Sequence, residues 1–209
     1  MTNLSLKRRG RPPKIARDAA DTRLMLIRGG TAVLTEQGFT ASGIDGILKQ
    51  VGVPKGSFYY YFASKEAFGR EIIAYYGRYF LRKLDRCLQD SDLAPLDRLR
   101  AFMDDAQRGM EKYAFRRGCL VGNLGQEINA LPGDYRQQLS AIFQQWQARV
   151  ADCLRLARAQ GQLAPDADCD ALADYFWIGW EGAVMRARLA GNAGPLQRFA
   201  TGFFAGLPK

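Results

Sequence analysis

Apolar residues recur along most of the chain at intervals of three and four, and no stretch sustains an alternation of apolar and polar positions. Spacing of this kind places the apolar side chains on one face of a helix, so we predict an all-α fold. Signals from Pro, Gly and Asp divide the chain into helices at about 17–37, 42–51, 54–62, 64–90, 95–113, 120–128, 134–160, 168–190 and 195–205. The clearest stripe lies on the seventh of them and joins Leu139, Phe143, Trp146, Val150, Leu154 and Ala157.

The second and third helices are short, and only the turn at residues 51–54 separates them. Ser42 and Asp45 fit a capping box, which predicts that the second helix begins at Ser42. Pro54 suits the start of the third helix, because the N–H that proline lacks would be unpaired there. The inward faces then hold Ile44, Ile47, Leu48 and Val51 on one helix and Phe58, Tyr61 and Phe62 on the other, while Lys55, Ser57, Tyr59 and Tyr60 point outward. Such a pair is typical of a helix-turn-helix, whose second helix enters the DNA major groove.

The same segment carries a family signature. The sequence VPKGSFYYYFASKEAF at residues 53–68 resembles the DNA-binding domain of the TetR family of bacterial transcriptional regulators, and the likeness extends back to about Asp21. The resemblance implies an N-terminal three-helix helix-turn-helix domain followed by a C-terminal helical ligand-binding and dimerisation domain. The chain departs from the family at Gly29 and Gly30, where alanines are usual and each glycine costs about 1 kcal/mol of helix propensity, and at Tyr60, where histidine is common. We therefore expect a flexible basic arm at residues 1–16, a DNA-binding domain at 17–63 and a regulatory and dimerisation domain at 64–209.

Positive charge is concentrated at the N-terminal end of the chain. Residues 1–65 contain eleven Lys or Arg against four Asp or Glu, whereas the remainder contains nineteen against seventeen. This asymmetry is the electrostatic pattern of a domain that binds a polyanion. With a helix-turn-helix in the same region, the expected partner is double-stranded operator DNA, read as a palindrome by a homodimer.

Six side chains of this region are candidates for DNA contact, namely Ser42, Lys55, Ser57, Tyr59, Tyr60 and Lys65. Lys65 follows Ser64, the predicted N-cap of the fourth helix, and a phosphate bound at that N-terminus would stabilise the lysine charge. We expect Lys55 to reach phosphate or a base edge, and the two tyrosines to pack on sugar-phosphate or thymine methyl groups. Alternatively, Lys65 is a solvated surface residue and the tyrosines are an aromatic pair that closes the small core.

Upstream of the first helix, KRRGRPPK at residues 7–14 resembles the RGRP core of an AT-hook. Gly10 and two prolines disfavour a packed element, so the segment is expected to be extended. Arg9 and Arg11 then fit a narrow minor groove beside the major-groove site. The alternative is a disordered basic tail that adds only nonspecific attraction.

The last two predicted helices are candidates for the dimer contact, as the resemblance implies for this family. They carry the small residues Gly179, Gly182, Ala183, Ala187 and Ala190, on which another helix can approach closely, and the aromatic residues Phe199, Phe203 and Phe204. Periodicity does not distinguish a partner helix from a helix of the same chain, so packing within the chain stays open.

The segment RRGCLVGNLGQE at residues 116–127 resembles a branch of the TetR family that responds to acrylate or to electrophiles, which implies a small-molecule effector. Cys119 follows two arginines and lies near a predicted helix N-terminus, and both features stabilise a thiolate. The candidate ligand or sensor residues are therefore Cys119 and Arg116, together with the aromatic residues Trp146 and Trp180. A buried, unreactive Cys119 is the alternative, since free cysteine is among the most buried residue types.

These patterns predict a ligand-responsive transcriptional regulator, a repressor that leaves its palindromic operator when a small electrophile or unsaturated acid such as acrylate binds. The expected link between the domains is the fourth helix, which joins them at Ser64 and Lys65. A constitutive architectural DNA-binding protein without effector control is the alternative. A thiol enzyme is not expected, because the chain contains no histidine to act as a base for Cys119.

Membrane and metal chemistry find little support in the sequence. No apolar run is long enough to span a bilayer and no signal peptide is evident, so we expect a cytoplasmic protein without a membrane partner. The four cysteines, Cys87, Cys119, Cys153 and Cys169, lack metal-ligand spacing. The glycines at 118, 122 and 125 lack the preceding strand and the lysine of a phosphate loop. No metal and no cofactor are therefore expected.

Overall fold

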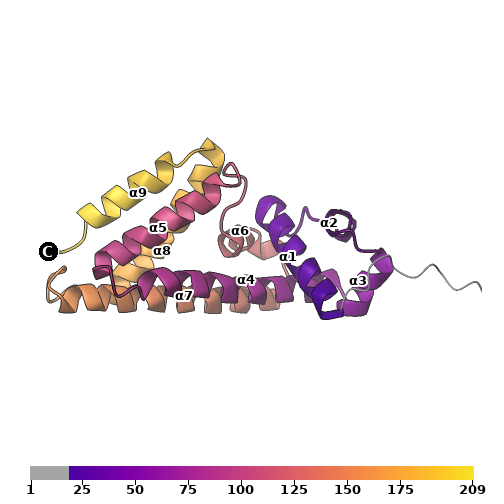
Figure 1. The fold of residues 1–209 in the computed structure, drawn as a ribbon, viewed down its shortest axis with the longest axis horizontal. Helices are drawn as coiled ribbons and strands as arrows, with labels where there is room; N and C mark the ends of the chain where they lie inside the picture. Colours follow the sequence, from indigo (N-terminus) through magenta and orange to yellow (C-terminus); the bar gives the residue numbers. More distant parts are fainter. Residues whose placement is uncertain (1–18) are drawn as a thin grey trace, which may run out of the picture.

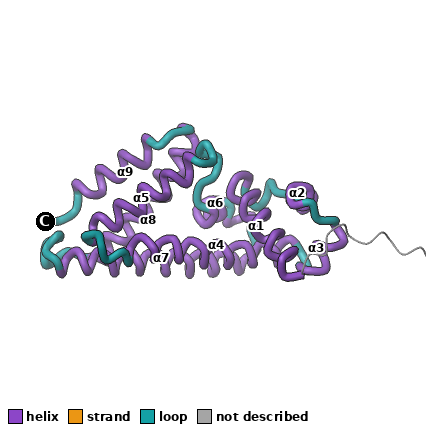
Figure 2. Tube along the Cα trace, viewed as in Figure 1, coloured by secondary structure: helices purple, strands orange, loops and turns teal. Residues whose placement is uncertain are grey.

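The computed structural model describes residues 19–209, and every regular element in that range is helical (Figures 1 and 2). The elements are α1 (Ala19–Gln37), α2 (Ile44–Val51), α3 (Lys55–Tyr61), α4 (Lys65–Leu88), α5 (Pro95–Glu111), α6 (Leu120–Gln126), the 3₁₀ turn η1 (Ile128–Ala130), α7 (Gly133–Ala159), α8 (Cys169–Ala190) and α9 (Gly194–Ala205). The predicted all-α fold is confirmed, and each predicted helix lies within a few residues of an observed one. Within residues 19–209, no helix combines the length and the apolar character needed to cross a membrane. The basic arm expected at residues 1–16, with Arg9 and Arg11, lies outside the described residues.

Helices α1, α2 and α3 lie together at one end of an elongated molecule, and α5, α7, α8 and α9 form a larger bundle (Figure 1). Helix α4 belongs to both groups, because it packs against α1 and also against α5 and α7. The short helix α6 lies between the groups, in contact with α1, α4 and α7. A continuous apolar core therefore connects the two ends of the molecule, from Leu26 in α1 to Leu207 after α9.

Two helix boundaries follow directly from their end residues. Gly52 ends α2 in the left-handed region, with φ 66°, where a residue without a Cβ carries no steric penalty. Ser64 caps α4 as predicted, because its hydroxyl accepts a hydrogen bond from the Ala67 amide at 3.1 Å. The local sequence therefore predicted both the turn between α2 and α3 and the start of α4.

The predicted cap at Ser42 is wrong. Helix α2 begins at Ile44, and its N-cap is Gly43, which makes no side-chain capping bond. The Ser42 hydroxyl instead donates to the Gly38 carbonyl, and the residue is only 1% exposed. Gly38 has φ 82°, so the chain turns back after α1 and places that carbonyl within reach of Ser42. The Ser42 hydroxyl therefore stabilises the turn between α1 and α2 and does not cap α2, although the local sequence pattern predicts a cap there.

Close packing explains the two glycines in α1. A Cβ on Gly29 would collide with the side chain of Val51 in α2. A Cβ on Gly30 would lie 2.5 Å from the Phe68 ring and 2.6 Å from Ile72, both in α4. Helix α1 therefore approaches its neighbours more closely than alanine permits, and the packing of three helices offsets the lower helix propensity.

We expect Gly30→Ala to lower the free energy of unfolding by about 1–2 kcal/mol, because overpacking a core outweighs the gain of about 1 kcal/mol in helix propensity. The matched control is Gly46→Ala in α2, where nothing lies within 4 Å of the added Cβ. That variant should be more stable by about 0.5–1 kcal/mol. Urea unfolding of both proteins measures the difference, and equal stabilisation by the two alanines would contradict the close approach.

Candidate functional site

Helix α3 presents a polar and aromatic face on the side opposite its core contacts. Phe58 is fully buried in an aromatic cluster whose neighbouring ring centroids lie 5.2–5.5 Å away. The outward face holds Lys55, Ser57, Tyr59 and Tyr60, of which the two tyrosines are 53% and 78% exposed. Three of the four predicted outward residues, Lys55, Tyr59 and Tyr60, are thus exposed, and Ser57 is half-buried. Their contact with DNA stays a prediction.

Lys55 makes a surface ion pair with Asp45 of α2. The ammonium nitrogen lies 3.0 Å from the carboxylate, and both side chains are mostly exposed. This hydrogen bond raises the pKa of Lys55, so its charge is maintained. Exposed pairs of this kind are weak, because solvent screens both charges, so a DNA phosphate can replace Asp45 as the partner of Lys55.

The two other predicted DNA contacts in the described range, Ser42 and Lys65, are engaged inside the protein. Lys65 donates a hydrogen bond to the Phe39 carbonyl at 2.7 Å, and its ammonium lies 4.3 Å from the centroid of the Phe39 ring. The buried Ser42 hydroxyl is bonded to Gly38. Both side chains support the turn between α1 and α2. The buried Ser42 hydroxyl could reach a phosphate only if that turn changed, whereas the half-buried Lys65 ammonium has further N–H donors, so its phosphate contact stays a prediction.

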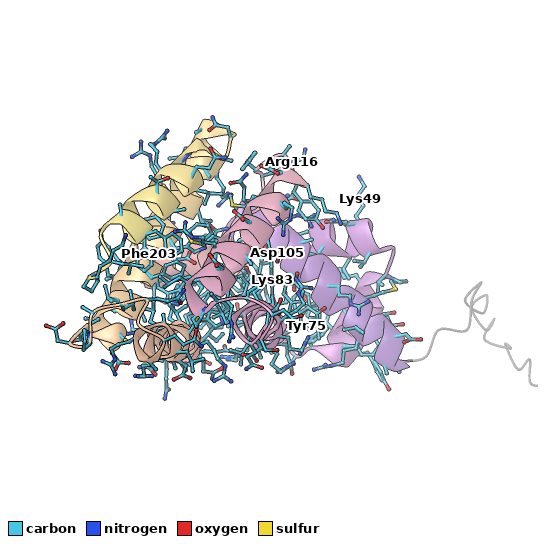
Figure 3. All side chains as sticks on the ribbon, turned by 60° about the vertical axis from the view of Figure 1, so that its left-hand side comes forward. Lys49, Tyr75, Lys83, Asp105, Arg116 and Phe203 are labelled. Carbon is cyan, nitrogen blue, oxygen red and sulfur yellow. The ribbon has the colours of Figure 1, made fainter. Side chains whose placement is uncertain are left out.

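A cavity of about 290 Å³ lies in the bundle beside α1, walled by α1, α4, α5, α8 and the loop before α6. It is lined by Arg28, Thr31, Ala32, Thr35, Tyr75, Tyr76, Tyr79, Phe80, Lys83, Ala106, Gly109, Met110, Tyr113, Arg117, Gly118, Cys119, Trp180, Glu181 and Val184. Tyr75 and Lys83 mark the α4 side of this region in Figure 3. The volume corresponds to a small organic ligand, at the lower end of the range for ligand pockets. Residues 19–209 contain no cluster of three or more groups that could hold a metal ion.

The predicted ligand residues divide into two that line the cavity and two that do not. Cys119 and Trp180 lie in its wall. Trp146 is fully buried behind the lining residue Phe80, and the two ring centroids lie 4.3 Å apart. Arg116 is exposed on the loop between α5 and α6 (Figure 3). Trp146 and Arg116 therefore do not line this cavity, since a core helix and a surface loop hold them, and a part for either in ligand sensing stays a prediction.

Cys119 is a buried, protonated thiol. It is 6% exposed, and its sulfur accepts from the Gly122 amide at 3.5 Å at the start of α6. Burial and the neighbouring Glu181 carboxyl group raise the pKa of the Cys119 thiol well above its ordinary value. Arg117 does not oppose this, because it is paired with Glu36 at 2.6 Å. The predicted thiolate is therefore wrong, since burial and a carboxyl group outweigh the adjacent arginines.

Glu181 is the site residue that the sequence reasoning missed. It extends from α8 to the first turn of α6, where a Cβ on Gly122 would collide with its carboxyl group. Burial raises the pKa of Glu181 to about 7, and its hydrogen bond with Cys119 acts in the opposite direction. Tyr76 of α4 completes the group, and burial raises the pKa of its phenol well above the ordinary value. The available signal was that Glu181 is the one charged residue between Phe176 and Met185.

Helix α6 connects this cavity directly to the turn between α1 and α2. The two Glu127 carboxylate oxygens accept from the Phe39 amide at 3.0 Å and from the Thr40 amide at 2.8 Å. Near the middle of α6, the Asn123 amide donates to the Thr35 carbonyl at 2.8 Å. The cavity residue Cys119 stands at one end of α6 and Glu127 at the other, so the position of α6 affects both places.

Helix α8 carries an exposed apolar stripe. Tyr175, Ile178, Met185 and Leu189 are 60%, 67%, 36% and 77% exposed, and the open position Gly182 continues their spacing of three and four. By contrast, a Cβ on Gly179 would collide with Phe199 of α9, and Ala183 and Ala187 are buried in the same chain. Most of the small residues predicted to form the dimer contact thus pack within the chain. The exposed face of α8 is the neighbouring apolar stripe.

Both parts of the chain match known protein families. Residues 26–72 match the family described as bacterial regulatory proteins, tetR family, and residues 95–203 match the domain described as tetracyclin repressor-like, C-terminal. The chain is 52% identical over 196 residues to the transcriptional regulator AcuR of Cereibacter sphaeroides, covering 94% of this chain and 89% of that protein. The crystal structure of regulatory protein TetR from Rhodobacter sphaeroides is 50% identical with a TM-score of 0.87, covering 88% of this chain and 97% of that one. The reduced form of E. coli NemR is 28% identical with a TM-score of 0.80, covering 88% and 95%.

The raised pKa of Glu181 has a defined effect on stability. Between about pH 4.5 and 7 the folded protein keeps a proton that an ordinary carboxyl group in the unfolded chain has lost, so the free energy of unfolding falls as pH rises through this window. Glu181→Gln removes this titration, and we expect its stability relative to the wild type to increase by about 1–3 kcal/mol from pH 4.5 to 8. Urea unfolding at several pH values measures the difference. A difference that stays constant with pH would show that Glu181 is solvated and titrates normally.

Proposed function

Because this chain belongs to the TetR family of bacterial transcriptional regulators, in the branch of AcuR and NemR, we propose that it is a homodimeric repressor controlled by a small molecule. It binds a palindromic operator through α3 and leaves the operator when an effector occupies the cavity beside Cys119. A regulator of this kind acts in the bacterial cytoplasm, where its operator lies.

The observation that carries the proposal is the double role of α6. Cys119, the N-cap of α6, lines the cavity. Glu127, directly after the C-terminal end of α6, accepts hydrogen bonds from two backbone amides of the turn between α1 and α2. A ligand that displaces the start of α6 also changes the support of the DNA-reading helices. The sequence interpretation assigned this role to α4, which contributes five cavity residues, and α6 adds a second and more direct connection.

We assign the DNA contact to the outward face of α3 and the dimer contact to the exposed stripe of α8. A single short helix reads only a few base pairs, and a twofold dimer doubles the number of specific contacts. The stripe spacing of three and four is that of helices packed side by side, and burying its four large apolar residues supplies the driving force for association.

The proposed effector is a small unsaturated acid such as acrylate. The likeness to AcuR and the limited volume of the cavity support a small ligand. Of the three lining cations, Lys83 and Arg117 are paired with Asp105 and Glu36, so Arg28, which makes no ion pair within the described residues, is the candidate partner for a carboxylate. The effector acts by occupancy and not by covalent addition, because the protonated thiol of Cys119 is a poor nucleophile.

Control requires that the effector bind two arrangements of the protein unequally. In one arrangement Glu127 holds the turn between α1 and α2 as described here, and in the other α6 is displaced. A hundredfold loss of operator affinity requires about 2.7 kcal/mol of difference in effector binding between the two arrangements. Loss of one or two charge-assisted hydrogen bonds, at about 1.5–3 kcal/mol each, is of that size.

The connection between cavity and turn favours this function over the two alternatives. Effector control gives a function to a cavity that is connected through α6 to the turn between α1 and α2, whereas a constitutive architectural DNA-binding protein does not require such a connection. A thiol enzyme needs an activated sulfur, whereas burial and Glu181 keep Cys119 protonated. Operator binding that does not respond to any small acid or electrophile would favour the architectural alternative.

The effector proposal is tested with acrylate on an operator selected from random duplexes. We expect acrylate to lower operator affinity at least tenfold in both wild type and Cys119→Ser, since the serine leaves the cavity in place. The intact mass should be unchanged, and dialysis should restore binding. A mass increase of one acrylate in the wild type, with no response in Cys119→Ser, would establish covalent control and contradict occupancy.

The DNA face is tested by comparing two of its residues on the same operator. Lys55→Ala should weaken operator and nonspecific duplex alike and reduce the slope of log affinity against log salt by about 1, because one phosphate contact is lost. Tyr59→Ala should reduce operator affinity about tenfold and nonspecific affinity much less, in line with about 1–3 kcal/mol for a base-edge contact. Lys209→Ala, at the far end of the chain, is the control and should change neither. Unaltered binding by both α3 variants would exclude this face.

The dimer contact is tested by charge on the α8 stripe. Ile178→Glu adds a charge to a side chain that is 67% exposed in the single chain, so folding should survive while two stripes no longer pack. We expect light scattering after gel filtration to report a monomer and operator affinity to fall at least tenfold. Leu156→Glu on α7, at a position 46% exposed, is the matched control and should remain dimeric. A dimeric Ile178→Glu protein would place the contact elsewhere.

A further inference from the structure

A groove of about 590 Å³ between α4 and α5 carries an unusual excess of positive charge. Its charged lining consists of five basic residues, Arg82, Lys83, Arg86, Arg108 and Lys112, and a single acid, Asp105. Elsewhere in residues 66–209, acidic residues outnumber basic ones, sixteen to fourteen. The groove is therefore a local concentration of cations in an otherwise slightly acidic part of the chain.

A single carboxylate forms ion pairs with three of these cations. Asp105 lies 3.1 Å from Lys83, 3.2 Å from Arg86 and 3.7 Å from Arg108, and its side chain is 23% exposed. Figure 3 shows Lys83 and Asp105 facing each other from α4 and α5. In the described part of the chain, Arg82 and Lys112 have no carboxylate within ion-pairing distance. Three cations on one carboxylate, with two more beside them, leave several positive charges without a counterion from the protein.

The groove also adjoins the effector cavity. Tyr79, Lys83, Gly109 and Tyr113 line both. Gly109 leaves the junction free of a side chain, and a Cβ there would lie 3.5 Å from the Lys83 ammonium. The two tyrosines border the junction and provide flat surfaces for an organic group. The charged groove thus continues into a mainly apolar space.

We propose that this groove binds an organic anion with at least two phosphate groups. Multivalent phosphate supplies several acceptor oxygens and two or more negative charges, which match the forked donors of the three arginines and the unbalanced charge around Asp105. A single carboxylate ligand would leave most of this charge uncompensated. The site goes beyond the effector cavity proposed above, and its existence does not depend on the identity of that effector.

The phosphates come from one of two sources. The first is a free nucleotide, which occupies the groove alone. The second is an acyl thioester on a phosphorylated nucleotide carrier, whose acyl end extends past Tyr79 and Tyr113 into the cavity. DNA is a different class of ligand, and the groove helix α5 lies on the other side of α1 from α2 and α3 (Figure 1).

Isothermal titration of the full-length protein with inorganic pyrophosphate, ADP and acetyl coenzyme A tests the site. We expect micromolar to submillimolar binding at low salt, and at least a tenfold loss in the double variant Arg86→Glu and Arg108→Glu. The control double variant Arg136→Glu and Lys209→Glu changes the net charge equally at exposed positions outside the groove, and its affinity should change less than twofold. If the first variant fails to fold, Arg82→Gln with Lys112→Gln removes two cations that hold no ion pair.

The three probes distinguish the sources. Equal affinity for ADP and the thioester, tighter than for pyrophosphate and without a change in tryptophan fluorescence, identifies a site filled by free nucleotide. Tighter binding of the thioester, with a fluorescence change from Trp180 in the cavity, identifies the carried acyl group. Absence of binding by all three probes, or equal losses in the groove and control variants, overturns the proposal. Neither result alters the acrylate experiment, because that experiment reads operator release with no pyrophosphate, nucleotide or thioester added.

Discussion

The arrangement of the DNA-binding end depends on how the turn between α1 and α2 is held. Glu127 accepts from the Phe39 and Thr40 amides, Lys65 donates to the Phe39 carbonyl, and Ser42 donates to the Gly38 carbonyl. Amides and carbonyls of a turn are not paired by secondary structure, so they need such partners when water is excluded. Two of the three side chains, Lys65 of α4 and Glu127 after α6, lie outside the helices α1, α2 and α3. The orientation of α2 and α3 is therefore set from outside the three-helix domain.

The proposed regulation depends on the small helix α6. A seven-residue helix is only about 10 Å long, so a ligand that shifts its first turn also shifts its last. The first turn contacts Cys119 and Glu181 in the cavity wall, and Arg188 of α8 anchors the middle by donating to Asn123 at 2.8 Å. Cavity, α6 and turn form one continuous set of contacts with a charged hydrogen bond at its end. The proposed two-state control requires that this set of contacts adopt two discrete arrangements.

The parts that sequence predicted well are those set by local spacing. Periodicity located the helices, Ser64 was a correct cap, and the outward face of α3 followed from its position opposite Phe58. The errors arose where a distant residue decides the outcome. Ser42 bonds to a carbonyl brought near by Gly38, and the Cys119 thiol faces a carboxyl group from α8. The glycines of α1 and most small residues of α8 serve contacts within the chain that no local pattern contains.

The most direct test of the account is hydrogen exchange at the Phe39 and Thr40 amides, measured by NMR with and without a saturating effector such as acrylate. Both amides are bonded to Glu127 in the arrangement described here. If effector binding displaces α6, these two amides should exchange at least tenfold faster in the presence of the ligand, and Glu127→Ala should exchange as fast without it. Unchanged protection of both amides in a protein that has released its operator would contradict the role assigned to α6.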